Sequence, residues 1–130
     1  MKKAVWVSLI LAVFAGVSPV KAQQPEKWKE MVAFHEIMST TFHPMEEGNF
    51  EPIRTRSADL LEKAIAWKNS TAPKGYDQSA VQKNLEKLVK GAKKVNNLAK
   101  KSGSDADLKE KLTELHETFH LITEKCRDEK

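Results

Sequence analysis

The stretch that decides the fold is residues 104–126, which read SDADLKEKLTELHETFHLITEKC. Its apolar positions recur at alternating intervals of four and three residues and comprise Leu108, Leu112, Leu115, Phe119, Ile122 and Cys126. This spacing places them on one stripe of an α-helix, because side chains three and four positions apart share a helical face. Ser104 is a suitable N-cap, with Asp107 three residues later. We therefore predict a helix that starts after Gly103, with Ser104 as its cap, and runs to about Arg127.

Three segments upstream show the same periodicity together with helix start and stop signals. Their expected bounds are from near Pro25 to the residue before His43-Pro44, from near Pro52 to about Asn69, and from the residue after Asp77, a suitable N-cap, to about Lys101. The expected core stripe of the first comprises Trp28, Met31, His35, Met38 and Phe42. Those of the second and third comprise Ile53, Ser57, Leu60, Ala64 and Trp67, and Val81, Leu85, Leu88, Ala92, Val95 and Ala99. The connections are short and no β-strand pattern competes, so we predict an all-α fold, an antiparallel up-down-up-down four-helix bundle.

The chain begins with the features of a secretory signal peptide. Lys2 and Lys3 supply positive charge, residues 4–17 are almost entirely apolar, and Ala22 is a small residue at a suitable cleavage site. The apolar run is short for a membrane span, so we expect cleavage after Ala22 and no stable membrane insertion afterwards; an uncleaved anchor is the alternative. We thus predict a signal peptide over residues 1–22 and one bundle domain over residues 23–130, exported to the periplasm.

The mature chain is expected to be nearly neutral. Three of the 22 basic residues leave with the signal peptide, and the remaining 19 face 18 acidic residues. A nucleic-acid-binding domain usually carries a clear basic excess, so we expect no nucleic-acid partner. Cys126 is the single cysteine and cannot form a disulfide within the chain. The alternatives for it are a link between two chains, a metal ligand, or a place in the core as a small hydrophobic residue.

The histidines suggest a metal site. His116 and His120 lie four residues apart, so their imidazoles are on one face of the last helix, one turn apart. Two imidazoles at this spacing can bind one ion, although the same spacing also occurs on helix surfaces without a function. His35 lies at a similar height on the first helix of an antiparallel bundle, and Glu62 of the second helix lies near that level. Three histidines with a carboxylate suit zinc or copper, so the predicted metal ligands are His35, His116, His120 and Glu62, with Glu117 as the alternative carboxylate. A core histidine bonded to other protein groups is the alternative for His35.

The segments MEEGNFEPIRTRSADLLEKAIAW (residues 45–67) and SGSDADLKEKLTELHETFH (residues 102–120) resemble the corresponding parts of cytochrome c-prime. That family comprises periplasmic four-helix bundles, often dimeric, which attach haem through C-x-x-C-H on the last helix, followed by an acidic residue and an aromatic. The matching stretch, LTELHETF at residues 112–119, keeps the histidine, the acid and the aromatic but has leucine in place of both cysteines. The resemblance therefore implies a periplasmic bundle, a homodimer and no covalent haem.

Non-covalent haem is the alternative cofactor that the resemblance leaves open. The related soluble b-type cytochrome bundle binds haem through a methionine of the first helix and a histidine of the last. By that analogy, Met31 pairs with His116 or with His120. Three hypotheses follow: a haemless bundle that binds a transition metal ion, a haem protein for electron transfer or gas binding, and a structural or interaction module without a cofactor. An enzyme is the least supported hypothesis, because no constellation of catalytic residues is visible. The one kind of enzyme left open is a redox enzyme built on a bound metal.

Overall fold

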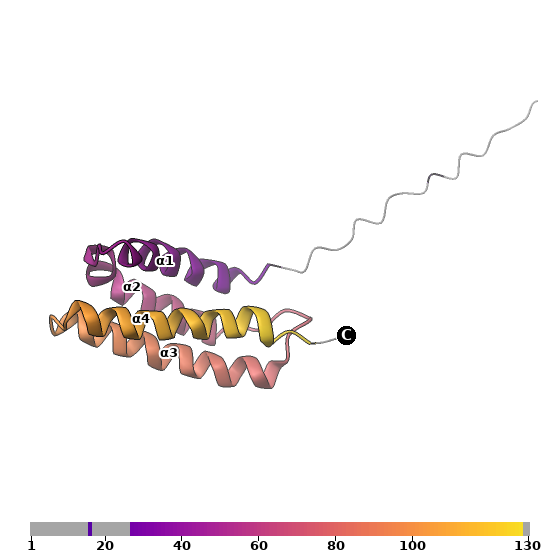
Figure 1. Ribbon diagram of the computed structural model, residues 1–130. Coiled ribbons are helices and arrows are strands. Elements are labelled where there is room, and N and C mark those ends of the chain that lie inside the picture. Colours follow the sequence, from indigo (N-terminus) through magenta and orange to yellow (C-terminus); the bar gives the residue numbers. More distant parts are fainter. Residues whose placement is uncertain (1–15, 17–26, 129–130) are drawn as a thin grey trace, which may run out of the picture.

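The computed structural model describes Gly16 and residues 27–128, and its regular structure is helical. The elements are α1 (Lys29–Glu46), α2 (Glu51–Lys68), α3 (Gln78–Lys100), α4 (Asp105–His120) and η1 (Leu121–Lys125), a π-helical turn that continues α4 (Figure 1). The four long helices pack together, which confirms the all-α, four-helix part of the prediction. Apart from Gly16, the predicted signal peptide lies outside the described residues. No helix in the described part of the chain is both long and apolar enough to cross a bilayer.

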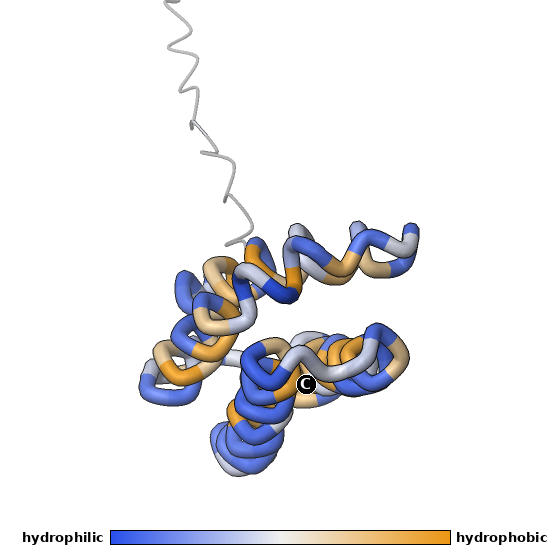
Figure 2. Tube along the Cα trace, turned by 90° about the vertical axis from the view of Figure 1, so that its left-hand side faces the viewer, coloured by the Kyte–Doolittle hydropathy of each residue, from blue (hydrophilic) through white to orange (hydrophobic). Residues whose placement is uncertain are grey.

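The helices pack against one another in chain order. Helix α2 packs closely against both α1 and α3, and α3 packs against α4, whereas α1 and α4 meet along a thinner seam. In Figure 1 the α1–α2 and α3–α4 connections lie at one end of the molecule, and the α2–α3 connection and the end of the chain lie at the other. Figure 2 shows hydrophobic residues mainly on the sides of the helices that face one another. The apolar stripes are therefore turned into a common core.

The predicted core stripes of the second and fourth segments are confirmed. All of their residues are buried, and in the third segment only Ala99 is partly exposed. Both predicted caps are present as well. The Asp77 side chain accepts a hydrogen bond from the backbone N–H of Ala80 at 3.0 Å, and Ser104 Oγ accepts one from that of Asp107 at 3.1 Å. These caps satisfy amide groups that a helix start otherwise leaves unpaired, and the ends of α2 and α3 fall within one residue of the predicted bounds.

The predicted core face of α1 was wrong at His35. The buried residues of this helix are Phe34, Ile37, Met38, Thr41, Phe42 and Met45. Trp28, Met38 and Phe42 of the predicted stripe are buried, but His35 is exposed and Met31 is only partly buried, so the buried face is shifted toward Phe34 and Ile37. Phe34 and Ile37 take the inner positions because burying a large apolar side chain is favourable, whereas a buried imidazole must find partners for both nitrogens. At the edge of the stripe, His35 keeps its ring in contact with water.

The prediction that α1 ends before His43-Pro44 was also wrong, since the helix continues through Pro44 to Glu46. Proline removes only one backbone donor, and it does not prevent a helix from continuing where packing supports the next turn. Here Met45 is buried in the core. Gly48, whose φ is +87°, then turns the chain and donates its N–H to the Met45 carbonyl at 2.9 Å. The expected start near Pro25 lies outside the described residues.

Two side-chain hydrogen bonds join segments that are far apart in the sequence, one within the core and one at its edge. Between α2 and α3, Ser57 Oγ donates a hydrogen bond to Asn96 Oδ1 at 3.0 Å, and both residues are buried. Near the end of the chain, Asn84 Nδ2 donates to the Sγ of Cys126 at 3.4 Å. Cys126 is itself buried, so it takes the core position among the three alternatives left open by the sequence.

Candidate metal centre

The centre of the candidate site is the histidine pair of α4. The Nε2 atoms of His116 and His120 lie 3.2 Å apart. Two nitrogens bound to one tetrahedral zinc ion at about 2.0–2.1 Å are about 3.3–3.4 Å apart, so the pair already has nearly the spacing that a shared ion requires. Without an ion, this distance is bridged by a hydrogen bond in which one ring donates its N–H to the lone pair of the other. The helix therefore holds both imidazoles with their Nε2 atoms directed at the same place.

Glu124 supports the pair from the turn that follows α4. Its Oε1 lies 3.2 Å from Nδ1 of His120. A carboxylate only accepts hydrogen bonds, so this contact places the proton of neutral His120 on Nδ1 and leaves a lone pair on Nε2. Metal-ligating histidines are commonly oriented in this way by a carboxylate behind the ring. Glu124 belongs to the π-helical turn η1, a type of element that occurs frequently at functional sites.

His116 is held by packing instead of by a carboxylate. Its ring stacks on Phe42 of α1, with ring centroids 4.0 Å apart and planes inclined by 7°. Partial burial lowers the pKa of His116, and the neighbouring His120 lowers that pKa further, because both disfavour the charged form of the ring. A neutral imidazole is the form that binds a metal ion. Packing against α1 thus favours the neutral form of His116 at neutral pH.

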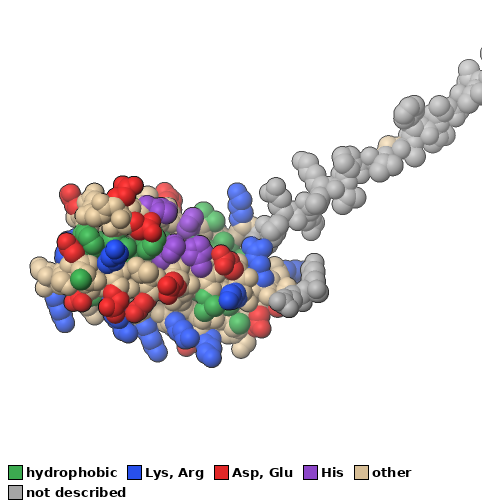
Figure 3. Space-filling model, in the orientation of Figure 1, with side chains coloured by type: hydrophobic (Ala, Val, Ile, Leu, Met, Phe, Trp, Pro, Cys, Tyr) green, Lys and Arg blue, Asp and Glu red, His purple; other side chains and the backbone are tan. Residues whose placement is uncertain are grey.

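The other two histidines belong to α1 and lie on the same face of the molecule, where Figure 3 shows the histidine side chains gathered in one group. The ring of His35 stacks on Phe119 of α4, with centroids 5.0 Å apart and planes inclined by 6°. His43 is exposed, and its Nδ1 lies 3.3 Å from Oε2 of Glu46. The α1–α4 seam is therefore lined by imidazoles from both helices.

The structure brings together two of the four predicted metal ligands. His116 and His120 converge, whereas His35 lies across the seam with its ring on Phe119. Glu62 is exposed on α2, and its carboxylate lies 4.0 Å from Nζ of Lys63. Among residues 27–128, no group of three or more histidine, cysteine, aspartate and glutamate side chains is placed to hold an ion. The contact between His116 and His120 is therefore the part of the predicted arrangement that the structure contains.

Two contributors to the site were missed by the sequence-based prediction. Glu124 lies four residues after His120, and this helical spacing was available in the sequence as a signal. Phe42 contacts His116 from another helix, and no local pattern indicates that contact. Met31, the predicted haem ligand, is partly buried and packs against the hydrophobic core.

No protein-family model, no curated protein and no solved structure matches this chain.

Proposed function

We propose that this chain binds a transition metal ion, zinc or copper, through His116 and His120 of α4, with His35 of α1 as the third ligand. The observation that carries the proposal is the 3.2 Å separation of the two Nε2 atoms, with Glu124 on Nδ1 of His120. Imidazole nitrogens suit both metals. A site of three histidines leaves one position for water or a small ligand, which fits an ion that is carried, buffered or sensed.

His35 is the best available third ligand because it faces α4 and because its exposed side chain can reorient. It faces α4 across the seam, where its ring stacks on Phe119 between the two helices. Its side chain is exposed, so its ring can leave the face of Phe119 without opening the core. Glu62 is less suited, since it lies on α2 beside Lys63. Metal binding in this form joins α1 to α4.

The filled core favours a metal ion over non-covalent haem. Leu112 and Leu115 stand where the cysteines of cytochrome c-prime would stand, and both are buried. Their side chains occupy space that a macrocycle beside His116 would need, and Met31 already packs against the core. The proposed protein is thus a haemless bundle of cytochrome c-prime type, exported to the periplasm by its N-terminal segment. We infer an antiparallel up-down-up-down arrangement because the connections alternate between the two ends of the molecule.

A metal titration of the purified protein tests the proposal. Zinc or copper is titrated in competition with a chromogenic chelator, and we expect one ion per chain. His116→Ala and His120→Ala should each abolish this binding, His35→Ala should weaken it, and His43→Ala, which removes the exposed imidazole beside Glu46, should weaken it less than His35→Ala. Bound metal also stabilises the fold, by about 2.7 kcal/mol when its free concentration is a hundredfold above Kd. Wild-type affinity in the variant lacking both His116 and His120, or no binding at all, would refute the proposal. A single saturable haem site with a Soret band would instead favour the haem alternative.

A further inference from the structure

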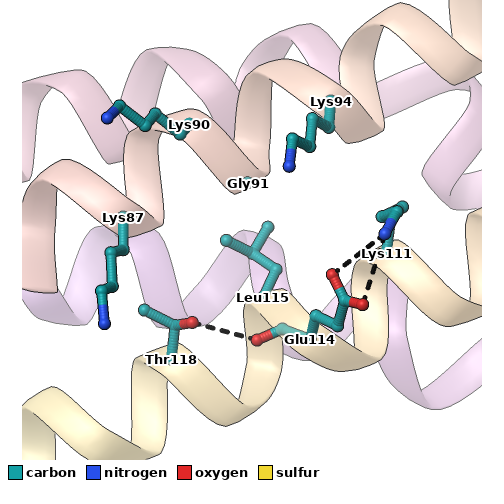
Figure 4. A pocket seen from close by; sticks show the side chains of 8 residues that line it. All are labelled: Lys87, Lys90, Gly91, Lys94, Lys111, Glu114, Leu115 and Thr118. Atoms are coloured by element: carbon teal, nitrogen blue, oxygen red, sulfur yellow. Dashed lines mark hydrogen bonds and ion pairs between the residues drawn. The ribbon is translucent and has the colours of Figure 1, made fainter.

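A second candidate site lies on the other side of α4. Thr118 stands between His116 and His120 in the sequence, and therefore faces away from the histidine pair on a helix of 3.6 residues per turn. On this side α3 and α4 enclose a hollow of about 220 Å³ (Figure 4). It is lined by Lys87, Lys90, Gly91, Lys94, Lys111, Glu114, Leu115 and Thr118. Four of these eight residues are lysines.

The positive charge of this hollow is largely uncompensated. Glu114 is the single carboxylate in the lining, and it pairs with Lys111 at 3.3 Å. Among the described residues, none of Lys87, Lys90 and Lys94 forms an ion pair. Figure 4 shows Lys87 and Lys94 extending from α3 toward α4 on either side of Leu115. The ammonium groups of Lys87 and Lys94 therefore border the depression without an ion-pair partner among the described residues, while the Lys90 side chain lies along α3 at its edge.

Gly91 gives the hollow its shape. A Cβ atom at this position would lie 3.1 Å from Cδ1 of Leu115, which is tighter than ordinary contact. The glycine therefore lets α3 approach α4 closely at this level. It lies four residues after Lys87 and three before Lys94, so the two lysines flank a position at which α3 has no side chain and Leu115 of α4 packs against its backbone. The depression is thus bounded by charged groups and floored by the buried side chain of Leu115.

We propose that this hollow binds a phosphate-type oxyanion, either as free phosphate or as the phosphomonoester group of a larger molecule. Pockets for drug-sized organic ligands measure about 300–1,000 Å³, so the smaller volume here suits a compact ion or head group. Lysine ammonium groups bind phosphate as point charges with several donors each. The hollow is open to solvent, so the remainder of a larger molecule can project outward. The inference is independent of the histidine site.

A titration with inorganic phosphate tests the inference. Amide resonances are followed at constant ionic strength, with chloride replaced by phosphate, and those of Gly91 and Thr118 should shift in a saturable manner. Lys87→Gln/Lys94→Gln should weaken binding about tenfold or more, since two of the charges are lost. The matched control is Lys83→Gln/Lys100→Gln, which removes the same charge from exposed positions of α3 outside the hollow, and it should change the affinity less than about twofold.

A vesicle arm distinguishes the two sources of phosphate. Cosedimentation is measured with phosphatidylcholine vesicles that contain phosphatidic acid and with phosphatidylcholine vesicles alone. Binding to the acidic vesicles that the Lys87→Gln/Lys94→Gln variant loses and the control variant keeps supports a lipid head group. Saturable binding of inorganic phosphate alone, with the same dependence on the variants, supports a free ion or soluble phosphomonoester. The inference is overturned if neither probe binds. It is also overturned if both variants lose binding equally, because the loss is then due to the lower net charge and not to the hollow.

Discussion

Replacing Glu124 by alanine should weaken metal binding without touching either ligand. The carboxylate lies 3.2 Å from Nδ1 of His120, where it fixes the proton and the orientation of the ring. Its removal leaves His120 free to rotate and to place its proton on Nε2, the nitrogen that should face the ion. Glu117→Ala is the matched control, since Glu117 is an exposed carboxylate of the same helix that forms no ion pair or hydrogen bond with either histidine in the described structure.

The size of the effect follows from the exposure of the pair. Loss of such a supporting partner typically costs 10–100-fold in metal affinity, about 1.4–2.7 kcal/mol. The side chains of His120 and Glu124 are 46% and 65% exposed, so water competes for the contact and the lower end applies. We therefore expect Kd to rise about tenfold, or about 1.4 kcal/mol. At a fixed metal concentration far above Kd, the metal-induced increase in Tm should then be smaller by roughly 6–10 °C for a domain of this size.

Isothermal titration with zinc at pH 7.5, together with thermal unfolding at several zinc concentrations, measures both quantities. Glu124→Gln should lie between the wild type and Glu124→Ala, because the amide oxygen still accepts from Nδ1–H but carries no charge. Unchanged affinity in Glu124→Ala would contradict the proposed role. An equal loss in Glu117→Ala would also contradict it, since the carboxylates would then act only through their general charge.

Three further predictions concern the fold. Because burial lowers the pKa of His116, the metal-free protein should keep this contribution to stability above about pH 6.5 and lose it as the pH falls through the folded-state pKa. The free energy of unfolding, measured with urea between about pH 5 and 8, should therefore fall less steeply with decreasing pH in His116→Gln than in the wild type. Ser57→Ala should cost about 1–3 kcal/mol in chemical unfolding by leaving buried Asn96 unpaired, and adding Asn96→Leu should recover part of that loss, so that strictly additive effects would count against it. Ser104→Ala should cost about 1 kcal/mol through loss of the α4 cap, and an unchanged unfolding midpoint would show that the cap does not contribute.

The sequence predicts most of this fold because local spacing determines it. In α2, α3 and α4, the four-and-three spacing of the apolar residues identifies the face that is buried, and the caps Asp77 and Ser104 mark where α3 and α4 begin. In α1, two apolar phases lie one residue apart, one passing through His35 and the other through Phe34. Periodicity alone cannot choose between them, since the choice depends on which rings meet across the bundle. Phe34 stacks against Phe119 of α4 at 5.9 Å, a contact between residues far apart in the chain.

In the candidate site too, contacts within one helix could be predicted from the sequence, whereas contacts between helices could not. The convergence of His116 and His120 follows from a spacing of four residues on one helix, and the contact from Glu124 to His120 has the same spacing. The support of His116 by Phe42 joins residues on two helices and could not be predicted from local pattern. The placement of His35 failed with the phase of α1, so the predicted three-ligand arrangement rested on a core position that this residue does not hold.

Because α1 and α4 meet along only a thin seam, we expect local opening between these two helices to precede global unfolding. The stacks of Phe42 on His116 and of His35 on Phe119 bridge that seam, while α1 is otherwise held mainly by α2. Elements with few buried contacts open locally at a smaller free energy than the whole protein, and they exchange their amide protons sooner. An ion bound by side chains of both helices would cross-link α1 to α4 and reduce this local opening. Amide protons of α1 would then exchange more slowly as the metal concentration rises. The bound ion would limit how often α1 opens and exposes the core.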